Sequence, residues 1–167
     1  MAASDASTLT PLFTLLRDAG GFRVFVESGT GTGDVATVAG DVFDTVITMD
    51  ADKASYDAAY EKLSGRKGIL PLHGAAAELI PNLIPRLAGP AVFWLNVPIG
   101  DLGSIVTAPK EHLICLPGGS AAAPEVQAAL TQGAPREADT RHGVLFLVPR
   151  SHEPLLQALF ARIGPLQ

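Results

Sequence analysis

The stretch at residues 22–34 reads FRVFVESGTGTGD, and it decides the predicted fold. It begins with an apolar run rich in β-branched and aromatic residues that ends at the acid Glu27, and glycine then occupies every second position, at Gly29, Gly31 and Gly33. After the glycines, apolar residues recur with the i, i+3, i+4, i+7 spacing of one helix face. This order predicts a strand, a glycine turn and a helix.

The glycine turn is predicted to bind a ligand. Glycine lacks Cβ, so it permits positive φ and lets a ligand approach the backbone closely. The N–H groups that begin the following helix then face the bound group. A flexible turn without a ligand is the alternative for a lone glycine triplet, but the strand before it and the helix after it favour a ligand loop.

The glycine spacing discriminates between ligands. The dinucleotide fingerprint G-x-G-x-x-G would require glycine at position 34, which is Asp34, and no lysine between Phe22 and Asp52 can complete a P-loop. The remaining pattern, acid-x-G-x-G-x-G, resembles the first motif of class I S-adenosylmethionine-dependent methyltransferases. The resemblance implies S-adenosylmethionine as cofactor, with Glu27 and the backbone of Gly29, Gly31 and Gly33 at its methionine end.

A second predicted strand, residues 45–49, ends at Asp50. An acid at this strand tip, about 20 residues after the glycine loop, can accept hydrogen bonds from both ribose hydroxyls of a nucleoside. We therefore expect Asp50 to bind the ribose. Asp52 is the competing candidate, although it directly precedes a predicted helix over residues 53–63 and more simply serves as its N-cap.

Strands and helices alternate along the chain, which predicts an α/β fold: a Rossmann-like, doubly wound, mostly parallel sheet with helices on both faces. The nearly all-apolar residues 91–97 are typical of a central parallel strand. Pro71 cannot donate to a central ladder, so the strand at residues 68–72 is placed at a sheet edge. Residues 144–148 form a further strand, in a hairpin with residues around 136–138.

The remaining helices are predicted at residues 9–19, 125–130 and 154–163. Residues 76–87 also have helical spacing, but Pro81 and Pro85 each remove a backbone hydrogen bond. We therefore expect two short helical segments there, or one helix that begins near Pro81.

Length and composition indicate one domain over residues 1–167, with residues 1–8 frayed. Charged residues make up 17%, below the roughly 25% of typical domains, which leaves apolar surface for a second subunit, such as a homodimer. No apolar run approaches a bilayer span and residues 1–8 lack signal-peptide features, so we expect no membrane association and a cytoplasmic location. The single cysteine, Cys115, lies in an apolar run and is interpreted as a buried thiol.

The charge balance argues against a nucleic-acid substrate. The net charge is −5 with a pI near 5.2, and the twelve basic residues are scattered. A nucleic-acid partner would require clustered Lys and Arg, so we expect no nucleic acid to bind. The histidines show no metal-ligand spacing with each other or with Cys115, so no metal site is predicted. His73, near the expected cofactor, is interpreted as structural.

The resemblance covers roughly residues 22–97. The blocks FVESGTGTGD, VITMDADKASYDAAYEKL and LHGAAAELIPNLIPRLAGPAVFWLN are similar to bacterial methyltransferases of small-molecule and glycan tailoring. In that group the third block reads His-Gly-Asp-Ser-Ala and the fourth strand ends Trp-Leu-Asp-Ala-His. Ala75 therefore stands at the aspartate near the adenine, where Glu78 is placed to compensate, and Asn96 and Pro98 replace the Asp and His of the strand tip.

Two functions are compatible with these departures. Asparagine is a poor ligand for hard metals and cannot act as a general base. The first function is therefore metal-independent methyl transfer to a small molecule by positioning, with Asn96 as the catalytic residue that orients the acceptor and residues 96–103 as the lip of its pocket. The second is a catalytically degenerate binding or assembly module. Residues 96–99 also resemble the N-P-P-aromatic tip of amino-methylating enzymes, without its second proline and aromatic residue.

Overall fold

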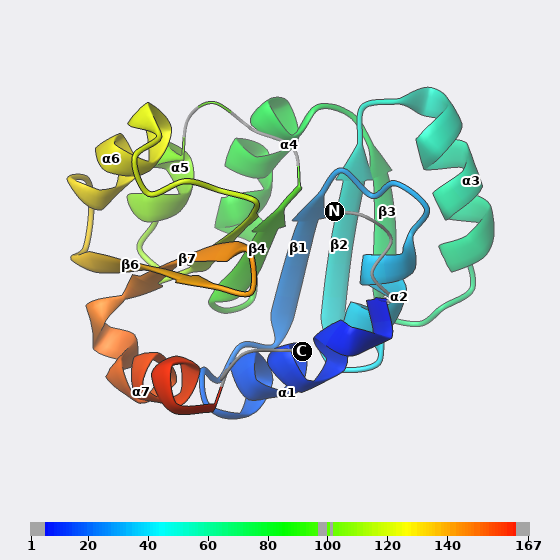
Figure 1. The fold of residues 1–167 in the computed structure, drawn as a ribbon. Coiled ribbons are helices and arrows are strands. Elements are labelled where there is room, and N and C mark those ends of the chain that lie inside the picture. The colour runs from blue at the N-terminus through cyan, green and yellow to red at the C-terminus, as the bar shows by residue number, and fades with distance from the viewer. Residues whose placement is uncertain (1–5, 97–99, 101, 163–167) are drawn as a thin grey trace.

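The structure is a computed structural model that describes residues 6–96, 100 and 102–162. Its centre is a seven-stranded sheet in the order β3-β2-β1-β4-β5-β7-β6 (Figure 1). The strands are β1 (Val24–Ser28), β2 (Thr45–Asp50), β3 (Ile69–His73), β4 (Ala91–Leu95), β5 (Leu113–Pro117), β6 (Arg136–Arg141) and β7 (Val144–Pro149). Strands β1 to β5 are parallel, and β7 is antiparallel to both β5 and β6. The predicted doubly wound, mostly parallel sheet is confirmed.

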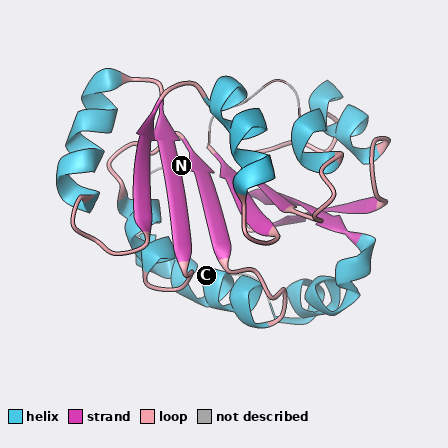
Figure 2. Ribbon diagram, turned by 180° about the vertical axis from the view of Figure 1, so that it is seen from behind, coloured by secondary structure: helices cyan, strands magenta, loops and turns pink. Residues whose placement is uncertain are grey.

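Helices cover both faces of the sheet, as Figures 1 and 2 show from opposite sides. One face packs against α1 (Thr10–Asp18), α2 (Asp34–Gly40), α3 (Lys53–Leu63) and α7 (Glu153–Arg162). The other packs against α4 (Ala76–Leu83), α5 (Gly103–Val106) and α6 (Pro124–Leu130). Short 3-10 helices are η1 (Ala6–Leu9), η2 (Ile84–Arg86) and η3 (Arg150–His152).

Side-chain alternation along β1 produces the two cores. Phe25 points into the core under α1, where its ring lies 4.9 Å from that of Phe13, and Phe13 in turn lies 5.4 Å from Trp94 of β4. Val24 and Val26 point to the opposite core, under α4 to α6. All five residues of β1 and of β4 are buried, as expected of central parallel strands.

Two predictions about sheet edges are confirmed. β3 lies at one edge, where Pro71 pairs in register with Thr48 of β2. Because β3 is an edge strand, the missing N–H of Pro71 does not interrupt the hydrogen bonding of a central strand. The expected hairpin at the other edge forms between β6 and β7, with His142 at φ 52° and Gly143 at φ 73° in its turn. Cys115 is buried within β5, as predicted.

One local prediction is confirmed and one is wrong. Residues 6–8, expected to fray, belong to η1, because this turn carries Leu9 into the core. Two short helical segments, the first of the two arrangements expected for residues 76–87, are present as α4 and η2, with Pro81 inside α4 and the change to η2 at Ile84. Pro81 lies on the exposed side of α4, while Ile80 on the buried side anchors it, so packing outweighs the one missing hydrogen bond.

Within the described ranges, no helix is both long enough and apolar enough to cross a bilayer.

Candidate functional site

The carboxyl ends of β1, β2 and β4 converge on the glycine loop. The register sets Glu27 of β1 beside Thr48 of β2 and Trp94 of β4. The loop is attached to β2, because the N–H groups of Gly29 and Thr30 both donate to the carbonyl oxygen of Met49, at 2.8 and 3.2 Å. The predicted ligand loop is therefore at the edge of the sheet where open α/β folds bind ligands.

The three glycines have different surroundings. All have positive φ, at 76° for Gly29, 56° for Gly31 and 83° for Gly33. A Cβ added to Gly31 would have no neighbour closer than 4.0 Å, whereas one added to Gly33 would lie 3.5 Å from Leu63 of α3. Gly31 thus faces open space that a ligand can enter, whereas Gly33 is the N-cap residue of α2 and packs against α3.

Asp50 lies beside this open part of the loop. Its Oδ2 accepts from the N–H of Gly31 at 3.1 Å, and its Oδ1 accepts from the N–H of Asp52 at 2.9 Å. Each carboxylate oxygen has a second acceptor position, so the group can still receive two hydroxyls. Asp52 is the N-cap of α3, where its Oδ2 accepts from the N–H of Ser55 at 2.9 Å, as predicted.

Glu27 lies beneath the loop and is only 1% exposed. Its Oε1 accepts from the Thr48 hydroxyl at 2.8 Å and its Oε2 from the Asn96 amide nitrogen at 3.0 Å. The hydroxyl of Thr48 is also 2.6 Å from that of Thr30. Burial raises the pKa of Glu27 to about 8, although the hydrogen bonds from Thr48 and Asn96 oppose this shift. Glu27 therefore joins β1, β2, β4 and the glycine loop through one polar cluster.

The two threonines of this cluster, Thr30 and Thr48, were not predicted as site residues. Both are buried, at 6% and 0% exposure. A signal was present in the sequence, since Thr48 is a polar residue in an otherwise apolar run just before Asp50. Its partnership with Glu27 depends on strand register, which the sequence alone does not define.

Asn96 lies directly after β4, and its amide is directed toward the loop. Its N–H donates to the Ser28 carbonyl oxygen at 3.2 Å, and its Nδ2 lies 3.4 Å from the Gly29 carbonyl oxygen in addition to its bond with Glu27. The structure thus brings Asn96 together with the residues of the glycine loop. Its role in orienting an acceptor stays a prediction, and Pro98 lies outside the described residues.

Ala75 and His73 lie at the end of β3. Ala75 is the N-cap residue of α4, and the preceding Gly74 donates its N–H to the Asp50 carbonyl oxygen at 2.9 Å. The position of Ala75 next to the adenine stays a prediction. The His73 ring packs 5.2 Å from that of Tyr56, with Nε2 3.2 Å from the carbonyl oxygen of Ala51.

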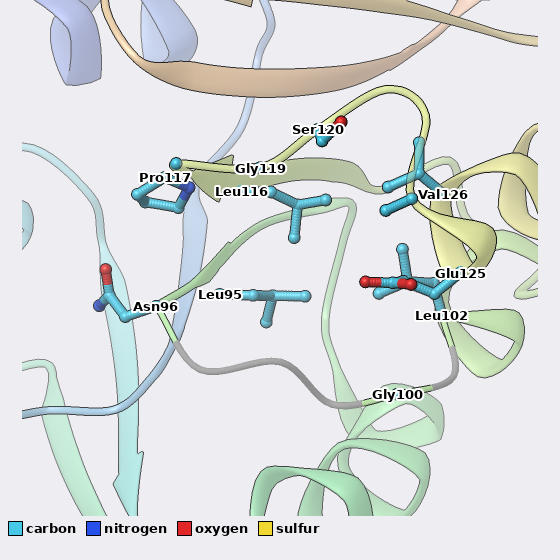
Figure 3. Close-up of a pocket in the computed structure, with 12 residues that line it drawn as sticks. Leu95, Asn96, Gly100, Leu102, Leu116, Pro117, Gly119, Ser120, Glu125 and Val126 are labelled. Atoms are coloured by element: carbon cyan, nitrogen blue, oxygen red, sulfur yellow. The ribbon is translucent and has the colours of Figure 1, made fainter.

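A separate cavity is lined by Leu95, the last residue of β4. Figure 3 shows it between the end of β4, the end of β5 and the start of α6, with Asn96 at one end and Glu125 at the other. No group of three or more His, Cys, Asp or Glu side chains among the described residues could hold a metal ion.

Comparison with known proteins identifies the fold. No protein-family model and no curated protein sequence matches the chain. A precorrin-6y C5,15-methyltransferase from Geobacter metallireducens is 15% identical, with a TM-score of 0.59 over 89% of this chain and 88% of that one. An O-methyltransferase from Bacillus cereus, solved in complex with SAH, is 12% identical, with a TM-score of 0.55 over 89% and 82%. The chain has the fold of class I S-adenosylmethionine-dependent methyltransferases.

The expectation that nucleic acid is excluded is wrong. An rRNA methylase from Streptococcus thermophilus shares this fold, with 13% identity and a TM-score of 0.53 over 89% of this chain and 98% of that one. The net charge of −5 is a sum over the whole chain and does not describe the face around one site. This fold thus occurs in an rRNA methylase as well as in a precorrin methyltransferase, and the net charge of the whole chain does not exclude a nucleic-acid substrate.

Proposed function

We propose that the protein is an S-adenosylmethionine-dependent methyltransferase that acts on a small molecule without a metal. The observation that carries this proposal is the open backbone at Gly31 beside the carboxylate of Asp50. S-adenosylmethionine is a nucleoside that carries an amino-acid chain. Its binding requires a backbone that the ligand can approach closely and a hydrogen-bond acceptor for the two ribose hydroxyls. The methyltransferase fold of the chain supports the same cofactor.

The roles of the residues follow from their positions. Asp50 would bind the ribose, the backbone of Gly29 and Gly31 the methionine end, and Ala75 would border the adenine. Glu27, held by Thr48 and Asn96, would fix the loop from below rather than face the ligand. The cofactor supplies an electrophilic sulfonium methyl group, and the protein's contribution is to hold an acceptor in line with it.

A degenerate binding module is the alternative function. The amide of Asn96 donates to Glu27, and it replaces an acidic residue that the resembling methyltransferases carry at this strand tip. Cofactor binding without turnover on hydroxyl, amine and carboxyl acceptors would favour this module.

Thermal unfolding with and without S-adenosylmethionine or S-adenosylhomocysteine tests the proposal. Ligand at 100 times its Kd adds about 2.7 kcal/mol to the free energy of unfolding. For a chain of this size that corresponds to a rise in Tm of about 5–10 °C. No rise at millimolar concentrations of either compound would refute the methyltransferase function.

Asp50→Ala is expected to weaken cofactor binding about 10- to 100-fold, because it removes the charged acceptor proposed for the ribose. Asp52→Ala is the matched control: it removes the N-cap of α3, lowers stability by about 1 kcal/mol and leaves affinity unchanged. Isothermal titration calorimetry measures both affinities. If Asp52→Ala weakens binding while Asp50→Ala does not, the ribose contact belongs to Asp52.

A further inference from the structure

The cavity beyond Leu95 is small and largely apolar. Its volume is about 230 Å³, below the range of about 300–1,000 Å³ that drug-sized ligands occupy. Its apolar lining includes Leu95, Leu102 and Val126, each no more than 4% exposed. Such a space accepts a compact apolar group, because binding transfers the apolar surface of that group from water to a carbon lining.

The wall between β5 and α6 is held in place by its own hydrogen bonds. Gly119 turns the chain tightly, since its N–H donates to the Leu116 carbonyl oxygen at 2.9 Å and a Cβ at this position would lie 2.7 Å from that of Leu116. The Ser120 hydroxyl accepts from the N–H of Ala122 at 3.2 Å. The Gln127 amide donates to the Ala121 carbonyl oxygen at 2.6 Å. This wall of the cavity is therefore formed before a ligand arrives.

One ionisable side chain, Glu125, occurs among the described residues that line the cavity. Figure 3 shows its carboxylate directed into the space that Leu95 and Leu102 border. Glu125 is partly buried, so its charge acts through a medium of lower dielectric than water. A bound cation would be attracted by it and a bound carboxylate repelled.

The cavity adjoins the proposed cofactor site. Asn96 lines one end of it, and its Nδ2 lies 3.4 Å from the carbonyl oxygen of Gly29 in the glycine loop. A group bound here would thus lie beside the methionine end of the cofactor.

We propose that this cavity is the acceptor site, and that Glu125 selects a small molecule with a compact apolar body and one cationic amino group. The inference rests on the proposed methyltransferase function for its reaction, but the selectivity of the cavity can be measured without turnover. Glu125 is assigned a specificity-determining role at the acceptor.

Three probes with one apolar body and different head groups test the inference: 2-phenylethylamine, 2-phenylethanol and 3-phenylpropionate. Their affinities are measured by calorimetry on the full chain at pH 7, with and without S-adenosylhomocysteine. We expect the amine to bind about 10- to 100-fold more tightly than the alcohol and the carboxylate to bind most weakly. Glu125→Gln should remove this preference. Glu153→Gln, which changes an acid in the first turn of α7, is the matched control and should retain it.

The outcomes separate the two proposals. Failure of S-adenosylhomocysteine to bind would refute the methyltransferase function. The preference for the amine would still be measurable without S-adenosylhomocysteine. Equal affinities for the three probes, or no binding of any, would overturn the acceptor assignment even if the cofactor binds. Binding of a single-stranded RNA oligonucleotide equally to wild type and Glu125→Gln, without amine binding, would overturn it in favour of a nucleic-acid face. The wild-type probe series decides these outcomes even if a variant fails to fold.

Discussion

Gly31→Val is expected to abolish the stabilisation of the protein by S-adenosylmethionine. The backbone of Gly31 has φ 56° and an added Cβ would meet nothing closer than 4.0 Å, so the new side chain would occupy the open space above the loop. A ligand that must approach this backbone closely would lose its place. The rise in Tm of about 5–10 °C expected at 100 times Kd should fall to within experimental error.

Gly65→Val is the matched control for this prediction. Gly65 also has positive φ, at 87°, and also has open space where a Cβ would stand, but it follows α3 at a distance from the glycine loop in sequence. Both variants place a β-branched residue in the left-handed region, which costs roughly 1–2 kcal/mol. Both should therefore unfold at lower temperature, and Gly65→Val alone should respond fully to the ligand. A full response in Gly31→Val would show that the ligand does not lie over this loop.

The elements around the loop were predictable because their signals are local. A strand, a glycine turn and a helix follow one another within residues 22–40, and the cap at Asp52 and the edge position of Pro71 depend on single residues with known backbone effects. The proline signal in residues 76–87 was also informative, since the region divides into α4 and η2. It did not locate the division, because Pro81 lies inside α4 next to the buried Ile80 and the change comes at Ile84.

The site itself depends on contacts that local signals do not contain. Thr48 and Asn96 reach Glu27 across 21 and 69 positions of sequence, because parallel pairing of β1 with β2 and β4 brings the strand ends together. Glu125 faces a cavity formed by three elements, and its residue type alone gives no sign of this. The net charge of the whole chain wrongly excluded nucleic acid for a related reason. It sums the charges of all faces of the molecule, and only the fold shows which charges lie on which face.

Glu27→Gln is expected to change the pH dependence of stability. Burial raises the pKa of Glu27 to about 8 from an ordinary value of 4.5, so between these pH values the folded protein holds a proton that the unfolded chain has released. Stability therefore falls as pH rises through this window, by up to about 1.4 kcal/mol per pH unit, and levels off above pH 8. Glutamine does not titrate and keeps the side chain's shape, so the variant lacks this loss.

Urea unfolding of wild type and Glu27→Gln from pH 5 to pH 9 measures the effect. Wild type should lose roughly 4 kcal/mol relative to the variant across this range, with most of the change below pH 8. Burial lowers the pKa of His112 to about 4. Because both proteins contain His112, its titration cancels when the free energies of unfolding of wild type and variant are subtracted. Glu61→Gln, at an exposed position of α3, is the control for a Glu-to-Gln substitution outside the core. A constant difference between Glu27→Gln and wild type would mean that Glu27 is ionised throughout, with Thr48 and Asn96 compensating its burial in full.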